Sequence, residues 1–283
     1  MIKYNFAIFI LTHGRANNVI TYDTLLKCGY SGKVYIIIDN EDKQVDKYKE
    51  LYGDKVIVFD KLKISEEFDT ADNFDNRKAI VYARNACFNI AKDLGLDYFL
   101  ELDDDYTDFM HRFIENGKLG FKSTKNLDTV CNAFLEFLEN TPTDSIAFAQ
   151  GGDFIGGKDN DRFNKGLIRK CMNSFFCSTK KPFTFLGRVN EDVNTYTRLA
   201  QIGKLFFTYT KFMLNQKQTQ SNKGGMTELY LDSGTYLKSF YSVMYSPSCV
   251  YVGEMGGSHK RIHHKIMWKN CTPLIINEKW KKR

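Results

Sequence analysis

The sequence predicts an α/β protein with a Rossmann-like, mainly parallel sheet flanked by helices. Three observations lead to this prediction: short apolar runs alternate with helical patterns over the first 105 residues, each apolar run stops at polar or acidic residues, and the helical patterns stop at glycine. Strands that alternate with helices indicate βαβ crossovers, which give a parallel sheet covered by helices.

Four apolar runs are expected to form the first strands, at residues 6–11, 34–38, 56–59 and 98–102. Between them, residues 17–28 and 78–94 have the periodicity of helices that pack on a sheet. Gly29 and Gly95 stand where these two helices should end. The first part of the chain therefore predicts strands and helices in regular alternation.

Beyond residue 105 the pattern is less regular. Helices are expected at 127–138, 195–202 and 234–245, strands at 145–149, 205–209 and 249–252, and loops at 151–166 and 216–225. No internal repeat, proline-rich linker or low-complexity block separates the two parts of the sequence. We therefore expect a single composite domain.

Composition argues against several classes of protein. No apolar run approaches the roughly 18 residues of a membrane helix, and the first residues turn polar too early for a secretory signal, so we expect a cytoplasmic protein with no membrane partner. Seven cysteines are scattered without a CxxC pair or zinc-finger spacing, which indicates reduced, buried thiols. With 283 residues, 43% of them hydrophobic, the chain can bury one substantial core.

The net charge of +6 hides an asymmetry along the chain. Residues 1–160 carry 19 Lys and Arg against 27 Asp and Glu, a net charge of −8, whereas residues 161–283 carry 21 against 7, a net charge of +14. Clustered cations gain free energy when they release the counterions of a phosphate backbone, so the second part suits a polyanion such as DNA. A solvated basic surface is the alternative.

Three consecutive aspartates, Asp103, Asp104 and Asp105, follow the fourth predicted strand. In open α/β sheets ligands bind beyond the carboxyl ends of the strands, so this trio is expected at a binding rim. Adjacent carboxylates repel, and a hard divalent ion such as Mn²⁺ or Mg²⁺ would neutralise them through oxygen ligands. In an extended chain Asp103 and Asp105 point to one side, which makes these two the predicted metal ligands. A solvated acidic turn is the alternative.

The segment ARNACFNIAKDLGLDYFLELDDD, residues 83–105, resembles the helix and strand that precede the DxD motif in glycosyltransferases of the GT-A fold. That resemblance implies a nucleotide-sugar-binding half at residues 1–105, with Mn²⁺ or Mg²⁺ on the diphosphate of a UDP-sugar, and an acceptor-binding, catalytic half at residues 106–283. The donor contacts that follow are Thr12 and Arg15 near the nucleoside, Asp39 near the base or ribose, Asp104 near the sugar or ribose, and Arg84 near the diphosphate. A guanidinium fork suits phosphate oxygens, and a position on the helix surface is the alternative for Arg84.

A second acidic pair stands in the phrase GRVNED, residues 187–192, just before a predicted helix. Sugar transfer requires a base that takes the proton of the acceptor hydroxyl, and a carboxylate in the pocket can supply it. By resemblance to inverting GT-A enzymes, Asp192 is the candidate catalytic base and Glu191 the reserve. Acidic residues in a first helical turn also favour the helix dipole, so capping without catalysis is the alternative.

Three of the five histidines fall within residues 259–264. GT-A enzymes often add a C-terminal histidine to the metal shell, so His264 and His263 are candidate metal ligands, without a choice between them. The adjacent Lys260 and Arg261 would neutralise the diphosphate of the departing UDP. A structural histidine is the alternative.

Residues 181–268 resemble a narrower group, the TET/JBP-associated glycosyltransferases found largely in bacteriophages. The resemblance is carried by the phrases FLGRVNEDVNTYTRLAQIGKLFFTYTKF, QKQTQSNKGGMTELY, GTYLKSFYSVMYSPSCVYV and RIHHKIMW. It implies a phage-encoded enzyme, in the host cytoplasm, that glycosylates 5-hydroxymethylated pyrimidines in DNA. The implied acceptor is 5-hydroxymethylcytosine first, and the sugar is glucose or arabinose.

The basic second part of the chain favours a DNA partner. Its predicted loop contains Lys217, Gln218, Gln220 and Lys223, whose amides can read base edges and whose lysines can hold phosphates. Tyr236 could stack on an extruded base, although aromatic residues on a helix more often belong to the core. The alternatives are a GT-A enzyme acting on a protein, glycan or polysaccharide, a DNA-binding protein without catalysis, and a nucleotidyltransferase.

Overall fold

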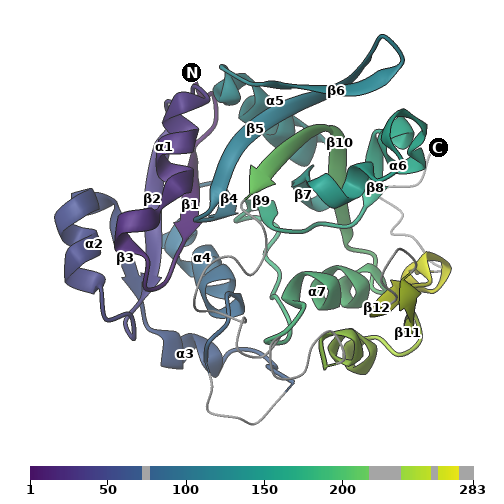
Figure 1. Ribbon diagram of the computed structural model, residues 1–283. Helices are drawn as coiled ribbons and strands as arrows, with labels where there is room; N and C mark the ends of the chain where they lie inside the picture. Colours follow the sequence, from purple (N-terminus) through teal and green to yellow (C-terminus); the bar gives the residue numbers. More distant parts are fainter. Residues whose placement is uncertain (72–76, 217–236, 256–260, 274–283) are drawn as a thin grey trace.

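A mixed sheet of ten strands forms the centre of the protein in the computed structural model (Figure 1), which describes residues 1–71, 77–216, 237–255 and 261–273. The strands are β1 (Phe6–Leu11), β2 (Lys33–Asp39), β3 (Val56–Phe59), β4 (Tyr98–Asp103), β5 (Tyr106–Glu115), β6 (Lys118–Ser123), β7 (Thr143–Ala149), β8 (Leu167–Arg169), β9 (Ser174–Ser178) and β10 (Leu205–Gln216). Their order is β3-β2-β1-β4-β9-β7-β10-β5-β6, and β8 pairs with β10. A separate antiparallel pair consists of β11 (Val250–Met255) and β12 (Arg261–Ile266).

Helices cover both faces of the sheet (Figure 1). They are α1 (Ile20–Lys27), α2 (Val45–Tyr52), α3 (Lys61–Ser65), α4 (Val81–Asp93), α5 (Leu127–Asn140), α6 (Asp161–Lys165) and α7 (Glu191–Ala200), with 3₁₀ turns η1 (Ala16–Asn18), η2 (Gly53–Lys55), η3 (Gly151–Phe154), η4 (Gly157–Asp159) and η5 (Trp268–Cys271). Residues 237–245 are also helical. One face packs against α1, α2 and α5 through residues such as Leu25 and Leu135, and the other packs against α3, α4 and α7 through residues such as Cys87 and Val193.

Strand β1 shows why a continuous apolar run was needed at residues 6–11. Successive side chains of a strand point to opposite faces of the sheet, so Ile8 and Ile10 enter the core on the α1 and α5 side, while Ala7 and Phe9 enter the core on the α4 side. All four are fully buried. Burial of an Ile or Phe side chain contributes about 1.5–3 kcal/mol, so both helical layers hold this strand in place.

The carboxyl ends of the parallel strands meet at one edge of the sheet. Strand β1 pairs in parallel with β2 and β4, and Leu11 stands opposite Asp103. Strand β2 pairs in parallel with β3, where Asp39 stands opposite Phe59. The rim expected from the sequence therefore exists, and the residues that follow these strands share it.

The predicted α/β class is confirmed, and β1 and β3 have the predicted bounds. Parallel pairing runs through β3, β2, β1 and β4 and recurs between β7 and β10, whereas the other neighbouring strands of the sheet are antiparallel. Strands from before and after residue 105 therefore belong to the same sheet.

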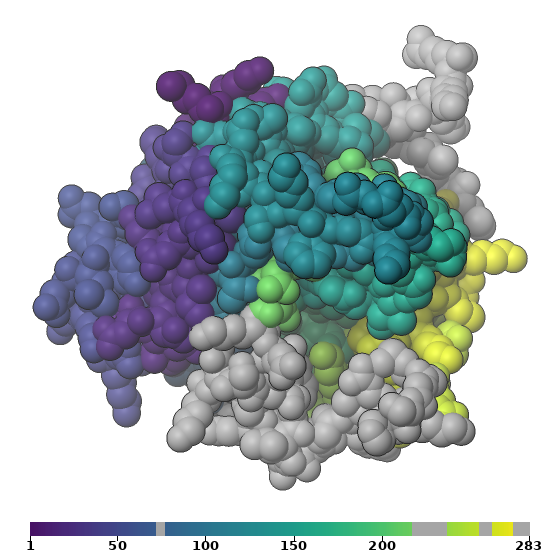
Figure 2. Space-filling view, turned by 45° about the horizontal axis from the view of Figure 1, so that its top comes forward, coloured from purple at the N-terminus to yellow at the C-terminus, as the bar shows by residue number. Residues whose placement is uncertain are grey.

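Several elements lack a counterpart among the predictions. Helix α2, VDKYKELY, has eight residues and a narrow apolar stripe of Val45, Tyr48 and Tyr52 among charged residues, so its signal is weak. Helix α6 lies inside the expected loop 151–166 and has only five residues, too few for periodicity to reveal. Strands β5 and β6 form a hairpin, in dark teal near the middle of the face seen in Figure 2. Its turn residues, Asn116 and Gly117, both have positive φ, and an Asn-Gly pair is the usual sequence signal of such a turn.

Two further properties of the described residues bear on the expectations from composition. No described helix is long and apolar enough to cross a membrane. All seven cysteines are buried and free, as their scattered spacing indicates. Burial raises the pKa of Cys87, Cys131 and Cys177 above that of an exposed thiol, which makes these thiols poor nucleophiles at neutral pH.

Candidate active site

Asp104 lies on the rim and accepts hydrogen bonds from two residues that follow β1. Thr12 Oγ1 donates to Asp104 Oδ2 at 2.6 Å, and Arg15 Nη1 donates to Asp104 Oδ1 at 2.8 Å. The Tyr48 hydroxyl lies 3.0 Å from Thr12 Oγ1 and accepts from the Arg15 backbone N–H at 2.8 Å. Because Asp104 is only 3% exposed, its carboxylate holds the segments after β1 and β4 together.

Asp39, the last residue of β2, is also paired with basic groups. His13 Nδ1 lies 2.7 Å from Asp39 Oδ2, and Lys61 Nζ lies 3.3 Å from the same oxygen. Burial alone would raise the pKa of Asp39, but the hydrogen bond from His13 and the charge of Lys61 lower it below its usual value. The Asp39 side chain is 6% exposed and the His13 side chain 52%, so the imidazole is the part of this pair that faces solvent.

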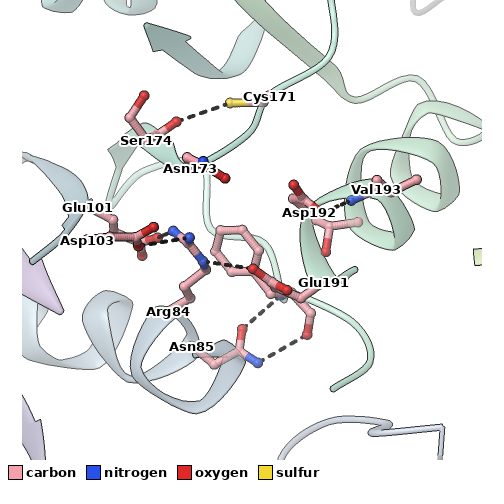
Figure 3. A network of polar contacts seen from close by, with 12 residues as sticks. Arg84, Asn85, Glu101, Asp103, Cys171, Asn173, Ser174, Glu191, Asp192 and Val193 are labelled. Carbon is pink, nitrogen blue, oxygen red and sulfur yellow. Dashed lines mark hydrogen bonds and ion pairs between the residues drawn. The ribbon is translucent and has the colours of Figure 1, made fainter. Parts of the chain in front are cut away.

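Arg84 joins the two acidic motifs (Figure 3). It extends from α4, and each guanidinium nitrogen donates to a different carboxylate: Nε to Glu191 at 3.2 Å, Nη1 to Glu101 at 3.4 Å and Nη2 to Asp103 at 3.3 Å. Glu101 and Asp103 are alternate residues of β4 and share a face, while Glu191 is the first residue of α7. A carboxylate 107 positions away from Arg84 in the sequence is thereby brought beside the aspartate trio.

The Arg84 guanidinium is enclosed by the protein. Arg84 is 1% exposed, and its guanidinium carbon lies 4.7 Å from the centre of the Phe175 ring and 5.8 Å from that of Phe185. Burial alone would lower the pKa of Arg84, but the charges of the surrounding carboxylates raise it, so the guanidinium stays protonated.

Three carboxylates surround the single positive charge of Arg84. Burial raises the pKa of Glu101 to about 8 and that of Asp103 to about 6, although Arg84 acts in the opposite direction on both. The Asp103 side chain is 26% exposed, so of these two carboxylates it is the one that solvent or a ligand can reach. Burial and the neighbouring charge of Asp192 raise the pKa of Glu191 in the same way. This part of the site is therefore short of positive charge.

Asp192 stands beside Glu191 but outside the contacts of Arg84 (Figure 3). Its Oδ1 accepts a hydrogen bond from the Val193 backbone N–H at 2.7 Å. The residue before the pair, Asn190, has a left-handed backbone with φ 54°, which is uncommon for a residue other than glycine and fixes the direction in which α7 begins. Glu191 therefore accepts from the Arg84 guanidinium, whereas Asp192 accepts from a backbone N–H group.

Strand β12 reaches the start of α7 through His264. Asn190 Nδ2 donates to the Lys238 carbonyl oxygen at 2.7 Å and lies 3.4 Å from His264 Nδ1. Burial, together with the charges of His263 and Lys238, lowers the pKa of His264 to about 3, so its ring is neutral. Ser242 Oγ, at 3.2 Å, lies nearer to Asn190 Nδ2 than His264 does, so the imidazole is the outermost of the three contacts of this amide group.

The described residues contain no group of three or more His, Cys, Asp or Glu side chains arranged to hold a metal ion. Asp103 and Asp105, on either side of the buried Asp104, are each partly exposed. Mg²⁺ commonly binds one or two carboxylates and takes its remaining ligands from water and substrate phosphates. Two partly exposed carboxylates beside unbalanced negative charge fit that mode of binding.

The chain matches a protein-family model over residues 6–225, and that model is described as TET-Associated Glycosyltransferase. The matched residues include the whole rim and the start of α7. The chain belongs to the TET-associated glycosyltransferase family. Its activity is accordingly glycosyl transfer, and the family resemblance expected from the sequence is confirmed.

Three solved structures illustrate what this TET-associated glycosyltransferase is similar to in fold. Glucosyl-3-phosphoglycerate synthase from Mycobacterium tuberculosis, in complex with Mn²⁺, UDP and phosphoglyceric acid, shares 8% identity at a TM-score of 0.47, covering 93% of this chain and 87% of its own. GalNAc-T7 with UDP, GalNAc and Mn²⁺ shares 10% identity at a TM-score of 0.44, covering 75% and 44%. S. aureus TarS shares 12% identity at a TM-score of 0.44, covering 75% and 36%. None of the curated proteins matches the chain.

The structure groups the sequence-predicted residues of this TET-associated glycosyltransferase in two sets. Thr12, Arg15 and Asp104 contact one another, and Arg84 contacts Asp103 and Glu191. Two sequence interpretations are wrong. Arg84 is not a surface arginine, since three carboxylates and two rings enclose it. The aspartate trio is not an extended strand, because β4 ends at Asp103 and the next two residues form the turn into β5.

Some predicted contacts fall outside the described residues. They are Lys217, Gln218, Gln220, Lys223, Tyr236 and Lys260, together with the side chain of Arg261. Their roles toward DNA and UDP stay predictions.

Several residues of the site are not evident from the sequence, among them Glu101, His13, Tyr48 and Lys61. Glu101 is fully buried beside Arg84, and its signal is a single carboxylate in the otherwise apolar run YFLEL, two residues before Asp103. His13 is one of several polar residues after β1, and its pairing with Asp39 depends on the parallel contact of β1 with β2. A charged residue inside a buried strand is the more usable signal, since it requires a partner.

Proposed function

We propose that this glycosyltransferase transfers glucose or arabinose from a UDP-sugar to the hydroxymethyl group of a 5-hydroxymethylpyrimidine in phage DNA, with 5-hydroxymethylcytosine as the first acceptor. The observation that carries the proposal is the Arg84 network, because it brings Asp103 of the aspartate trio to the Glu191–Asp192 pair. The family description favours a modified DNA base as acceptor.

The donor end of the site suits Mn²⁺ or Mg²⁺. Asp103 and Asp105 would hold the ion, with water and the UDP diphosphate completing its shell. His264 or His263 would be a further ligand through an unprotonated ring nitrogen, and binding through Nε2 of His264 would require the proton of its ring to lie on Nδ1. When bound, the ion would offset the negative charge that develops on the departing UDP. The raised pKa of Asp103 supports this assignment, since burial and neighbouring carboxylates leave it without sufficient positive charge.

Asp192 is the proposed catalytic base. It would take the proton of the hydroxymethyl group while that oxygen bonds to the anomeric carbon and the bond from this carbon to UDP breaks, so that UDP leaves with the electron pair. Glu191 is less suited to this step because its carboxylate already accepts from buried Arg84. The different surroundings of the two carboxylates support Asp192 as the base and Glu191 as its support.

Charge supports DNA as the acceptor. Residues 161–283 carry a net charge of +14, which suits the phosphates that flank a modified base. Thr12, Arg15 and Asp39, on the β1–β2 side of the rim, are the proposed contacts of the donor nucleoside. Asp104 would act on the sugar or ribose through Thr12 and Arg15, because both already bind its carboxylate.

The proposal is tested by incubating the protein and Mn²⁺ with DNA that contains 5-hydroxymethylcytosine, together with UDP-glucose or UDP-arabinose in separate reactions. Nucleoside mass spectrometry should detect a hexosyl or pentosyl adduct on the modified base. Unmodified cytosine DNA is the matched control and should give no adduct. If neither UDP-sugar gives an adduct on DNA, and sugar is transferred to a protein or polysaccharide fraction instead, DNA is not the acceptor.

A further inference from the structure

We propose that Arg84 is a positioning residue that couples Asp103, on the donor side, to Glu191 at the start of α7, and that Glu101 is its buried anchor. This inference rests on the proposed function, because it concerns the same site. It assigns Arg84 a role other than binding the diphosphate.

The contacts of Arg84 argue against direct binding of phosphate. A phosphate-binding arginine needs N–H groups that reach the ligand. Each of the three guanidinium nitrogens of Arg84 already donates to a carboxylate, and only 1% of the residue is exposed. The rings of Phe175 and Phe185 lie against the guanidinium. A diphosphate would have to displace protein partners to reach it.

The same contacts make Arg84 a rigid connection between three elements. Glu101 is fully buried on β4 and holds Nη1, which fixes the guanidinium from the interior of the sheet. Asn85, the next residue of α4, exchanges two hydrogen bonds with the backbone of Phe185, at 3.1 and 2.8 Å (Figure 3). The ring that covers Arg84 is therefore anchored to the same helix. Five donors in a planar fork allow such a connection, and lysine would not reproduce it.

Coupling follows from this rigidity. A donor complex that engages Asp103 changes the charge and position of one partner of Arg84, and Arg84 transmits the change to Glu191. Because Asp192 follows Glu191 directly, the catalytic carboxylate moves with it. Displacement of a reacting group by about 1 Å can cost about 10²-fold in rate, so loss of Arg84 is expected to lower turnover more than donor affinity.

The test compares Arg84→Lys, Glu191→Gln and the double variant with wild type, measuring kcat and KM for the UDP-sugar in transfer and in donor hydrolysis. Each single variant should lower kcat by about 10- to 100-fold and leave the KM for the donor within about threefold. The double variant should be no slower than the slower single variant, because the two residues act as one unit. The surface substitution Arg198→Lys, on the same helix α7, is the matched control and should behave as wild type.

A rise of about tenfold in donor KM with kcat preserved in Arg84→Lys would assign Arg84 to the diphosphate and overturn the proposal. A double variant whose loss of kcat equals the product of the two single losses would overturn the proposal as well. If Arg84→Lys does not fold, Glu101→Gln decides instead, since it keeps the contacts of Arg84 with Asp103 and Glu191. A lower kcat of Glu101→Gln at unchanged donor KM supports the role of Glu101 as the anchor of Arg84, and an unchanged kcat contradicts it.

Amide hydrogen exchange gives a readout that does not depend on the acceptor. Adding Mn²⁺ and UDP should slow exchange in the first turn of α7 in wild type and should not do so in Glu101→Gln. Slowed exchange in both proteins would overturn the coupling. A wild type that shows this response but transfers no sugar to hydroxymethylated DNA would refute the proposed acceptor and leave the coupling intact.

Discussion

The two sides of the rim treat their acidic residues differently. On the β1–β2 side the buried carboxylates have several basic partners: His13 lies beside both Asp39 and Asp42, Lys61 pairs with Asp39, and Arg15 pairs with Asp104. On the β4–α7 side three carboxylates share the one guanidinium of Arg84. The first side thus has three basic side chains for three carboxylates, whereas the second has one guanidinium for three carboxylates.

The pKa directions express this difference. Burial acts on Asp39 and Asp103 in the same direction, yet the pKa of Asp39 is lowered by its basic partners, while that of Asp103 is raised by burial and by its acidic neighbours. The surrounding charges therefore indicate that Asp39 has a structural role, whereas Asp103 is suited to bind a cation.

The largest effect is expected where charge is unbalanced. Asp103→Asn and Asp105→Asn should each lower glycosyl transfer by about 10³-fold or more, because the ion that stabilises the leaving group loses a ligand. In wild type, Mn²⁺ at 100 times its Kd should stabilise the fold by about 2.7 kcal/mol, and neither variant should gain this. Melting curves with and without Mn²⁺ measure it. Asp159→Asn, an exposed carboxylate, is the control; an equal response in all four proteins would place the ion elsewhere.

Asp192→Asn should lower kcat by about 10²- to 10⁴-fold with donor binding retained, since the variant keeps the size of the side chain but cannot take a proton. Steady-state kinetics and calorimetric titration with UDP and Mn²⁺ separate the two quantities. Weaker UDP binding in proportion to the loss of kcat would move Asp192 from the base to the donor site.

Asp104→Asn should act mainly on stability. The substitution removes one oxygen acceptor from Thr12 or Arg15 in a buried position, at a cost of about 1–3 kcal/mol. Urea unfolding measures the loss. Activity of the folded fraction should fall far less than in Asp103→Asn, and a loss of activity without loss of stability would give Asp104 a direct role with the donor.

Asp39→Asn should change stability in a way that depends on pH. Because the folded-state pKa of Asp39 is lowered, its carboxylate contributes stability above its unfolded pKa of about 3.9, and that contribution disappears as pH falls through the folded pKa. The free energy of unfolding of wild type should exceed that of the variant by about 1–3 kcal/mol at pH 6, because Lys61 would be buried without its carboxylate, and the difference should narrow toward pH 3. Urea unfolding at both values tests this, and a constant gap would contradict it. The stabilisation by Mn²⁺ should persist in the variant.

The sequence predicted the parallel half of the fold because β1, β2 and β4 are largely buried on both faces and the edge strand β3 is also an apolar run. Strands β1 and β3 are continuous apolar runs closed by polar residues, which is the pattern that such burial requires. The position of the aspartate trio followed from this, since parallel strands deliver their carboxyl ends to one edge.

The Arg84 network could not be predicted in the same way. Its members come from α4, β4 and α7, and the contact with Glu191 spans 107 positions. Periodicity describes the faces of single elements and contains no information on which arginine meets which carboxylate. The carboxylate inside the apolar strand β4 was the one local sign that a buried cation stood opposite.

The burial of all seven cysteines has a practical consequence. A cysteine introduced at an exposed site would be the fast-reacting thiol of the folded protein, so a cross-linker can be attached there without first removing the native thiols. Placing such a tether in turn along the chain, and recording which positions capture a duplex oligonucleotide, would map the path of the nucleic acid over the enzyme.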